Sequence, residues 1–453
     1  MENLLKDKFK FSFLLIILAI LSFFPNINFY EFRNEESLRT IVAFEMAYSH
    51  NLLQPTFLGD LYFNKPPLFN WFIIFSSYLI PWSELTARIV SIFFVILTLV
   101  LIYKFSFKLT KNKEISILAS LIYITFVDIL FWYGYLAEID ATLAFFVFLM
   151  FYFLFWGYKE KKGIFLILAG IITGIAFLLK GFPAYAFFGL SYLALLIYYK
   201  DLKGLFNPYI WIGGICSLFI PLIWIFNTAN PDIYLQKLFV ESFNRVEQSK
   251  DFSKFFIHLI SYPVLNFKQI LPASLFVLIG IFIYRKNLRI PSEIKLLLFI
   301  AFINYIPYLI SVGSRGRYII PLFPILAVIF AYLIYSFNKE KIIKIFLYTA
   351  LSFIIIRFLV GFIGFPIMMK YKESRKKIAY DIAKTIDIRQ KIAFDCASEK
   401  SICLYLDFIK NKPIFKSSHT KDWKYLITCE EKPQYKIVKS YKFKKKIIKL
   451  YER

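Results

Sequence analysis

Acidic and basic side chains gather between residues 34 and 71, just after the first apolar run of the chain. Glu35 and Glu36 are adjacent at the start of a helix-like pattern, and Lys65 stands directly before Pro66-Pro67. A positioned carboxylate can act as a general base, and a cation can balance the charge of a departing phosphate. The prolines favour an extended backbone that aims the Lys65 side chain. The segment predicts either chemistry at an interface or a solvated loop whose acids complement a helix N-terminus.

Four more charged residues lie between later apolar runs. Asp140 follows Glu138 in one turn, Lys180 and Arg317 lie in two others, and Arg245 lies in a longer loop near residues 227–267. Carboxylates near a membrane are costly and face a cavity or a partner. The alternative for each acid is a structural ion pair, and the alternative for each cation is a side chain that extends to lipid headgroups.

Three other charged positions are interpreted as structural. Glu84 and Arg88 are four residues apart at the start of an apolar helix, which favours a pair within that helix. Asp128 lies well inside an apolar run, so we expect it to face protein or water. No spacing of His or Cys indicates a metal site, and we predict no cofactor, although a divalent metal is not excluded.

The composition identifies an integral membrane protein. The 453 residues are 59% hydrophobic and 21% aromatic, above the range of soluble domains. The formal charge of +25 is typical of nucleic-acid binding, but the basic residues recur in short loops between apolar runs. That distribution is the positive-inside pattern of a membrane protein. It predicts a multi-pass plasma membrane protein with a cytoplasmic N-terminus.

The apolar runs predict about eleven membrane spans, or thirteen if some are broken helices. The runs lie near residues 11–25, 86–104, 114–136, 140–157, 163–180, 183–199, 208–226, 270–284, 294–312, 317–337 and 342–366. The segment 68–82 is short and bounded by prolines, so we expect an interfacial helix there and not a span. With this topology Glu35, Lys65, Asp140, Lys180 and Arg317 all fall on the extracytoplasmic side.

The apolar pattern stops near residue 369, and the rest of the chain predicts a small soluble domain. A helix is expected around 374–386, with short strands at 391–394 and 425–428. Residues 370–453 hold 23 basic and 10 acidic side chains, a net charge of about +13. Of the four cysteines, Cys396 and Cys403 are candidates for a disulfide in an oxidising compartment, and the alternative is unpaired buried thiols.

The predicted fold class is therefore an all-α polytopic membrane protein with a small C-terminal α/β soluble domain. Residues 1–369 form the membrane domain, with a first outer loop at 26–67 and the interfacial segment at 68–82. Residues 370–453 form the basic C-terminal domain, which this topology places outside the cytoplasm.

Several motifs of the chain resemble one group of membrane enzymes. They are E-E-S-L-R-T-I-V-A-F-E-M, L-Q-P-T-F-L-G-D-L-Y-F-N-K-P-P-L-F-N-W, Y-L-A-E-I-D-A-T, L-L-K-G-F-P and R-G-R-Y-I-I-P-L-F-P. Together they resemble GT-C membrane glycosyltransferases, in the branch that holds the lipid A aminoarabinose transferases and the dolichyl-phosphate-mannose protein mannosyltransferases. The match extends over most of residues 10–330, and its most specific part is the first-loop motif.

The resemblance implies roles for the residues that match the family pattern. Glu35 matches the first acid of the pair, the presumed base, which is usually Asp in the family; Glu36 matches the second acid and Asp140 the second-loop acid. Lys65 matches the lysine that meets the lipid phosphate. Other matches to the phosphate-binding positions are Arg317, Tyr318, Arg245 and, in the L-L-K-G-F-P motif, Lys180. Asn64 replaces an acid often found before the lysine, so a possible metal ligand is missing.

The resemblance also implies the reaction. A sugar would pass from a polyprenyl-phosphate donor to an acceptor on the extracytoplasmic face, with inversion, and the acceptor would be lipid A, a protein or another envelope glycan. The implied partners are this donor, the acceptor and membrane lipids, with no nucleic acid and with the chain as a monomer. Two other function classes remain open, a transporter or flippase of lipid-linked saccharides and a ligase that moves a preassembled glycan.

Overall fold

The computed structural model describes residues 7–247, 252–284, 288–337 and 340–453. The chain divides into two compact units. The helical unit consists of Met1–Phe24, Asn64–Pro66 and Ser91–Phe358. The mixed unit consists of Pro25–Phe63, Pro67–Val90 and Leu359–Arg453. Residues of the first loop are thus grouped with the C-terminal residues, although some 300 positions separate them in the sequence.

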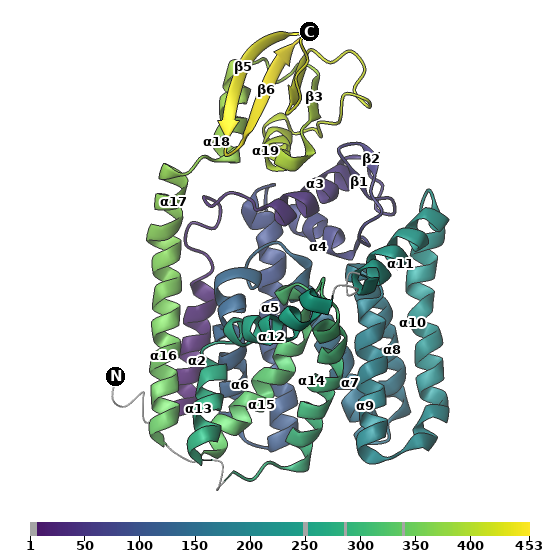
Figure 1. Ribbon diagram of the computed structural model, residues 1–453, viewed down its shortest axis with the longest axis vertical. Coiled ribbons are helices and arrows are strands. Elements are labelled where there is room, and N and C mark those ends of the chain that lie inside the picture. Colours follow the sequence, from purple (N-terminus) through teal and green to yellow (C-terminus); the bar gives the residue numbers. More distant parts are fainter. Residues whose placement is uncertain (1–6, 248–251, 285–287, 338–339) are drawn as a thin grey trace. The chain divides into compact units, whose positions relative to one another are not determined.

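The helical unit is built from long apolar helices (Figure 1). They are α2 (Lys8–Leu21), most of α5 (Glu84–Thr110), α6 (Lys113–Thr125), η1 (Ile129–Tyr133), α7 (Ile139–Lys159), α8 (Gly163–Lys180), α9 (Pro183–Tyr199), η2 (Leu202–Phe206), α10 (Pro208–Phe226), α11 (Pro231–Glu247), α12 (Phe252–Gln269), α13 (Ala273–Tyr284), α14 (Ser292–Ile310), η5 (Gly316–Leu322), α15 (Phe323–Ser336) and α16 (Glu340–Leu359).

The chain is a polytopic membrane protein, but its described residues hold fewer helices of spanning length and composition than the eleven to thirteen expected. Among the described residues, seven helices are long and apolar enough to cross a membrane, or up to eight if α12 and α13, bent by 105°, count as one span. The predicted runs at 11–25, 114–136 and 183–199 form helices of 14, 13 and 17 residues. The run at 114–136 is interrupted because Phe126 adopts an extended ψ of 132°, after which the chain forms the π-helix η1.

Glycines allow α8 and α10 to pack with their backbones in contact. A Cβ atom on Gly170 would lie 2.1 Å from the Gly213 carbonyl oxygen, and one on Gly174 would lie 2.4 Å from that of Ser217. Close approach at small residues is a main source of helix association in membranes, where lipid removes the hydrophobic driving force between helices. This packing fixes the position of α8, which ends at Lys180.

Lysine-rich junctions meet at one end of the helices. Lys108, near the end of α5, pairs with Glu160 at 2.5 Å, and Lys159 of α7 pairs with Glu293 of α14 at 3.0 Å. Asp140 lies at the opposite end of α7 from Lys159, about 30 Å away at 1.5 Å per residue. The chain therefore separates its basic junctions from the turn that carries Asp140.

The mixed unit combines short helices with a four-stranded sheet (Figure 1). Its elements are α3 (Asn34–Tyr48), β1 (Thr56–Phe57), β2 (Asp60–Leu61), α4 (Leu68–Ser77), the first turns of α5, η6 (Val360–Gly364), α17 (Phe365–Tyr371), α18 (Arg375–Thr385), β3 (Ile392–Asp395), η7 (Ala397–Glu399), α19 (Lys400–Lys410), β4 (Tyr425–Thr428), β5 (Lys436–Phe443) and β6 (Lys446–Glu452). The α4 helix, expected to be interfacial, has 10 residues and is too short to span a bilayer.

The C-terminal residues form the expected mixture of helix and strand. The sheet order is β3-β4-β6-β5, with β3 parallel to β4 and the remaining pairs antiparallel. The predicted helix and both predicted strands are confirmed as α18, β3 and β4. The helix α19 and the hairpin β5–β6 were not predicted. The two strands of the hairpin are rich in lysine and lack the regular apolar alternation that identifies a strand.

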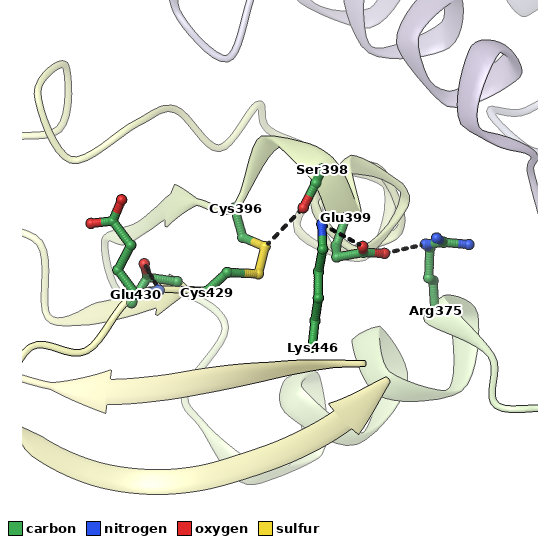
Figure 2. Close-up of a disulfide and its surroundings, with 8 residues drawn as sticks. Arg375, Cys396, Ser398, Glu399, Cys429, Glu430 and Lys446 are labelled. Carbon is green, nitrogen blue, oxygen red and sulfur yellow. Dashed lines mark hydrogen bonds and ion pairs between the residues drawn. A yellow bond between two sulfur atoms is a disulfide. The ribbon is translucent and has the colours of Figure 1, made fainter. Parts of the chain in front are cut away.

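A disulfide joins Cys396, after β3, to Cys429, after β4, with a Cα–Cα distance of 5.2 Å (Figure 2). The candidate pair Cys396–Cys403 is wrong, because Cys403 lies on α19 as a buried free thiol. The alternative of unpaired buried thiols is confirmed for Cys403 and wrong for Cys396. Because parallel neighbouring strands end at the same edge of a sheet, the register of β3 and β4 brings Cys396 and Cys429 together.

Candidate functional site

Three turns of the helical unit bring acids and cations into one cluster. Lys180 Nζ lies 2.5 Å from Asp140 Oδ1, joining the end of α8 to the first turn of α7. Arg317, at the start of η5, donates from Nη1 to Glu138 Oε2 at 2.7 Å, and its Nε lies 3.9 Å from Asp140 Oδ2. Lys180 Nζ also lies 4.7 Å from the centre of the Tyr318 ring. The structure therefore brings together four residues that the sequence analysis singled out, namely Asp140, Lys180, Arg317 and Tyr318.

This cluster is largely withdrawn from solvent. The Asp140 side chain is 4% exposed, Lys180 11% and Arg317 17%. Two carboxylates and two cations balance, so the cluster meets the requirement that buried charges be paired. Glu138 was noted in the same turn as Asp140, but the sequence assigned it no role. Its place two residues before Asp140, at the start of the same helix, was the available signal.

The turn that carries Arg317 packs against α12. A Cβ atom on Gly316 would lie 2.6 Å from Gln269 Nε2, so the Gln269 amide packs directly on the glycine. The same amide nitrogen donates to Asp128, the buried acid of the third apolar run. Tyr262, two turns earlier on α12, donates to the Arg315 carbonyl oxygen at 3.3 Å. Asp128 thus faces protein, as expected.

Lys65 belongs to the helical unit through its short segment Asn64–Pro66. Its carbonyl oxygen accepts a hydrogen bond from the Tyr234 hydroxyl of α11 at 2.6 Å. Tyr234 is fully buried, and its ring packs edge-on against Trp224 at 4.6 Å. The Lys65 backbone is therefore anchored on a rigid aromatic pair, while its side chain is half-buried.

Glu36 is held inside the mixed unit by a fully buried guanidinium. Arg88 donates from Nε to Glu36 Oε1 at 2.8 Å and from Nη2 to Oε2 at 2.9 Å, and neither side chain is exposed. The backbone N–H of Arg33 also donates to Glu36 at 2.9 Å. Both carboxylate oxygens are thus engaged, which is the geometry of a structural ion pair.

The expected pair within α5 is wrong, because Arg88 reaches α3 instead of Glu84. Arg88 also donates to the carbonyl oxygens of Ile27 and Tyr30 at 2.6 and 2.8 Å. Glu84 instead accepts from Lys376 at 2.6 Å and from the Tyr405 hydroxyl at 2.9 Å. These tertiary partners are more than 50 residues away, so the spacing of four could not reveal them.

Glu35 has a different environment from its neighbour. Its side chain is 33% exposed and lies 3.7 Å from Nη2 of Arg39, which donates from Nη1 to the Tyr62 hydroxyl at 3.0 Å. Lys400, at the start of α19, lies in the field of Glu35. Burial lowers the pKa of the Lys400 ammonium, and the Glu35 charge opposes that shift. Lys400 was missed because nothing in the sequence links α19 to the first loop.

A third acid of the first loop, Glu45, supports the β1–β2 hairpin. Its carboxylate accepts from the backbone N–H groups of Leu58 at 2.6 Å and Gly59 at 3.3 Å. Burial raises the pKa of Glu45 to about 7, against these hydrogen bonds, which lower it. Glu45 therefore binds a proton more readily than an ordinary glutamate.

For the Arg245 side chain and for a metal site, the part of the chain that the structure describes gives no coordinating or binding geometry. Arg245 lies in α11, but its side chain is outside the described residues. Within the described ranges, no three His, Cys, Asp or Glu side chains are arranged to hold a metal ion.

The sequence of this chain is similar to those of known transferases. Residues 64–225 match the family model described as dolichyl-phosphate-mannose-protein mannosyltransferase. A curated relative from Yersinia pestis, an undecaprenyl phosphate-alpha-4-amino-4-deoxy-L-arabinose arabinosyl transferase, is 28% identical over 255 residues, 53% of this chain and 45% of the relative. The enzyme of that name from Yersinia enterocolitica is 28% identical over 63% of this chain and 52% of its own length. The matches thus span about half the length of these relatives.

Structural comparison extends the likeness to nearly the whole chain. The crystal structure of ArnT from Cupriavidus metallidurans bound to undecaprenyl phosphate has a TM-score of 0.69 at 14% identity, covering 96% of this chain and 97% of that one. The apo oligosaccharyltransferase of Archaeoglobus fulgidus has a TM-score of 0.51 at 11% identity, covering 92% of this chain and 69% of that one. The chain therefore has the fold of ArnT, and its sequence resemblance to the GT-C membrane glycosyltransferases is confirmed.

Proposed function

We propose that this chain is an integral-membrane glycosyltransferase that moves a sugar from a polyprenyl-phosphate donor to a lipid A, protein or other envelope acceptor. The observation that carries the proposal is the cluster of Asp140, Glu138, Lys180 and Arg317, which collects buried charge at one end of three membrane helices. Such a cluster suits a lipid-linked donor, whose phosphate must sit where the hydrocarbon ends. The match to relatives named as undecaprenyl-phosphate-sugar transferases supports the same donor class.

The cations of the helical unit would hold the donor phosphate. Lys180 and Arg317 both contact Asp140, and a phosphate would compete with that carboxylate for both cations. Cations that follow the phosphate as it leaves stabilise the developing charge on the leaving group. Lys65, Tyr318 and Arg245 are assigned to the same phosphate by the family pattern. In this assignment Asp140 orients the two cations, since it contacts both Lys180 and Arg317.

Glu35 would act on the acceptor. Among the matched acids it is the one with a partly exposed carboxylate, whereas both oxygens of Glu36 are bound by Arg88. A carboxylate in this state can take the proton of an attacking hydroxyl and so drive inversion at the sugar carbon. Glu36 then acts as a positioning residue that fixes the first turn of α3.

The extracytoplasmic side is the proposed location of the mixed unit. The disulfide Cys396–Cys429 supports this side, because disulfides persist in oxidising compartments and are rare in the cytosol. The paired lysine-rich junctions at the other end of α7 support a cytoplasmic assignment for that end. We infer a plasma membrane protein with its reaction outside the cytoplasm.

Mass spectrometry of envelope lipids and glycans tests the proposal in a strain that lacks this chain. The expected result is one missing sugar on one acceptor, with accumulation of its polyprenyl-phosphate donor. Loss of a whole oligosaccharide would instead indicate a ligase. Accumulation of donor only on the cytoplasmic side would indicate a flippase, and an unchanged envelope would reject all three.

A further inference from the structure

The β5–β6 hairpin ends in an exposed, strongly basic tip. Lys442, Lys444 and Lys445 are exposed around its turn, and Lys446 begins β6. Ile447, directly opposite Lys442 in the ladder, is 53% exposed. Exposed lysines beside an exposed aliphatic side chain form a surface that is both cationic and apolar.

Several contacts fix this tip next to the end of α17. The backbone N–H of Lys444 donates to Glu373 Oε2 at 2.6 Å, and Glu373 comes two residues after α17 ends at Tyr371. The Arg375 guanidinium lies 4.3 Å from the centre of the Phe443 ring. Glu399 pairs with Arg375 at 2.6 Å and with Lys446 at 3.6 Å, and lies between them (Figure 2). The hairpin and the start of α18 therefore form one connected piece.

The α17 helix is the last part of an apolar helical run, Glu340–Tyr371, which at 32 residues is long enough to cross a membrane. At the end of this run the exposed side chains change from apolar to basic and aromatic. Ile367 and Met368 are followed by Lys370, Tyr371 and Lys372. Tyr371 is 77% exposed. Tyrosine and lysine at the end of a span are typical of the level of the lipid headgroups. The fixed contacts bring the hairpin tip to the same level.

The residues at the end of α17 and at the hairpin tip are here called the exit cluster. They are Lys370, Tyr371, Lys372, Lys442, Lys444, Lys445 and Ile447. We propose that the exit cluster binds the phosphate headgroups of anionic phospholipids in the leaflet where α17 ends. Each lysine near an anionic membrane surface is attracted to it, and this attraction falls off within a Debye length. Several lysines held at one level by the hairpin therefore act together. The neighbouring acids leave the cluster positive, since Glu399 is paired with Arg375 and Glu373, which accepts from the Lys444 backbone, offsets one lysine only.

The opposite end of the same sheet supplies a matched control. Lys421, Lys424 and Lys436 are also exposed and lie near the far end of β6, where Tyr425 and Lys436 flank Glu452 in the register. Seven residues of strand separate the two ends by about 20 Å. Neutralising either set of three lysines removes the same charge from the same sheet.

A spin label on Ile447→Cys, in a Cys216→Ser background, tests the proposal with the full chain in nanodiscs. The discs hold phosphatidylcholine alone, or an equal mixture of it with either phosphatidylglycerol or a phosphorylated glycolipid. We expect a water-soluble relaxation agent to reach the label several-fold less in the anionic discs, and high salt to reverse the change. Lys442→Gln/Lys444→Gln/Lys445→Gln should abolish the difference, and Lys421→Gln/Lys424→Gln/Lys436→Gln should keep it.

Three outcomes would overturn the proposal. They are equal accessibility in the two lipids, an equal loss in both triple variants, and a difference that appears only with a phosphorylated glycolipid. The second would mean attraction by net charge alone, and the third a surface for an acceptor and not for bulk lipid. An unchanged thermal transition verifies that each variant is folded. If the first triple variant unfolds, the single variant Lys445→Gln is tested by the same comparison.

Discussion

At the scale of the residue, neighbouring acids of the same type have opposite environments. Glu35 is partly exposed at the first turn of α3, whereas Glu36 is fully buried against Arg88. The residue types alone predict an acid pair, but helix geometry turns successive side chains by about 100° and so separates their roles. Which acid faces solvent depends on Arg88, whose contact with Glu36 no local pattern reveals.

Glu35→Gln and Glu36→Gln should therefore fail in different ways. Glu35→Gln should lower turnover by about a hundredfold or more, as expected for loss of a general base, with stability changed by less than about 1 kcal/mol. Glu36→Gln should destabilise the protein by about 3 kcal/mol, because Arg88 is left buried without its counter-charge. Thermal unfolding and sugar transfer, measured on both variants, check this. Loss of stability in Glu35→Gln with turnover intact would reverse the two assignments.

The buried Glu45 predicts a pH dependence of stability. Its pKa is about 7 in the folded chain and 4.5 as an ordinary glutamate, so folding favours the protonated form. Its contribution is fully present below pH 4.5 and is lost as the pH rises through 7. The total loss is about 3 kcal/mol at about 1.4 kcal/mol for each pKa unit.

Glu45→Gln removes this titration. Relative to wild type, the variant should gain stability between pH 5 and 8, which thermal unfolding across that range measures. Glu35→Gln is the control, since its carboxylate is partly exposed. A parallel pH profile for wild type and Glu45→Gln would contradict the assignment.

At the scale of the element, α12 positions the turn that holds Arg317. The sequence places Arg317 in a turn, but α12 is identified as its support only when Gln269 is seen packed on Gly316 and bonded to Asp128. A Cβ atom at position 316 would meet the end of the flexible Gln269 side chain, which would have to shift and strain its hydrogen bond to Asp128.

Gly316→Ala should reduce transfer by up to about tenfold, because the new Cβ atom displaces the Gln269 amide and weakens its support of the turn that holds Arg317. Gln269→Ala removes the group with which that Cβ atom collides. The double variant Gly316→Ala/Gln269→Ala should consequently be more active than Gly316→Ala alone. Steady-state kinetics with varied donor checks the order, and a double variant worse than both single ones would show that the turn is not set by this contact.

At the scale of the whole molecule, the sequence predicts a membrane protein whose charged turns meet, and the contacts among Asp140, Lys180 and Arg317 agree. The number of spans was not predictable, because breaks such as Phe126 and the bend between α12 and α13 leave composition unchanged. The grouping of the first loop with the C-terminal residues rests on contacts such as Phe32 N–H to the Tyr405 hydroxyl at 2.8 Å, across 373 positions. Local patterns carry no information on such pairs.

Reduction of the disulfide should destabilise the C-terminal residues. Cys396 and Cys429 are 33 positions apart, and a loop of that length contributes about 4 kcal/mol by the chain-entropy relation. Cys396→Ser/Cys429→Ser should lower the unfolding transition to the same extent as a reductant does, while Cys216→Ser leaves it unchanged. A double variant as stable as wild type would show that the bond does not contribute in the membrane-bound protein.

The central claim is transfer of one sugar from a polyprenyl phosphate by these acids and cations. The most direct measurement is mass spectrometry of the lipids after purified protein is mixed with a bacterial lipid extract that contains polyprenyl-phosphate sugars and candidate acceptors. We expect wild type to release polyprenyl phosphate and add one sugar mass to one acceptor. Glu35→Gln and Asp140→Asn should do neither. Equal conversion by wild type and both variants, or no conversion of any lipid-linked sugar, would contradict the account.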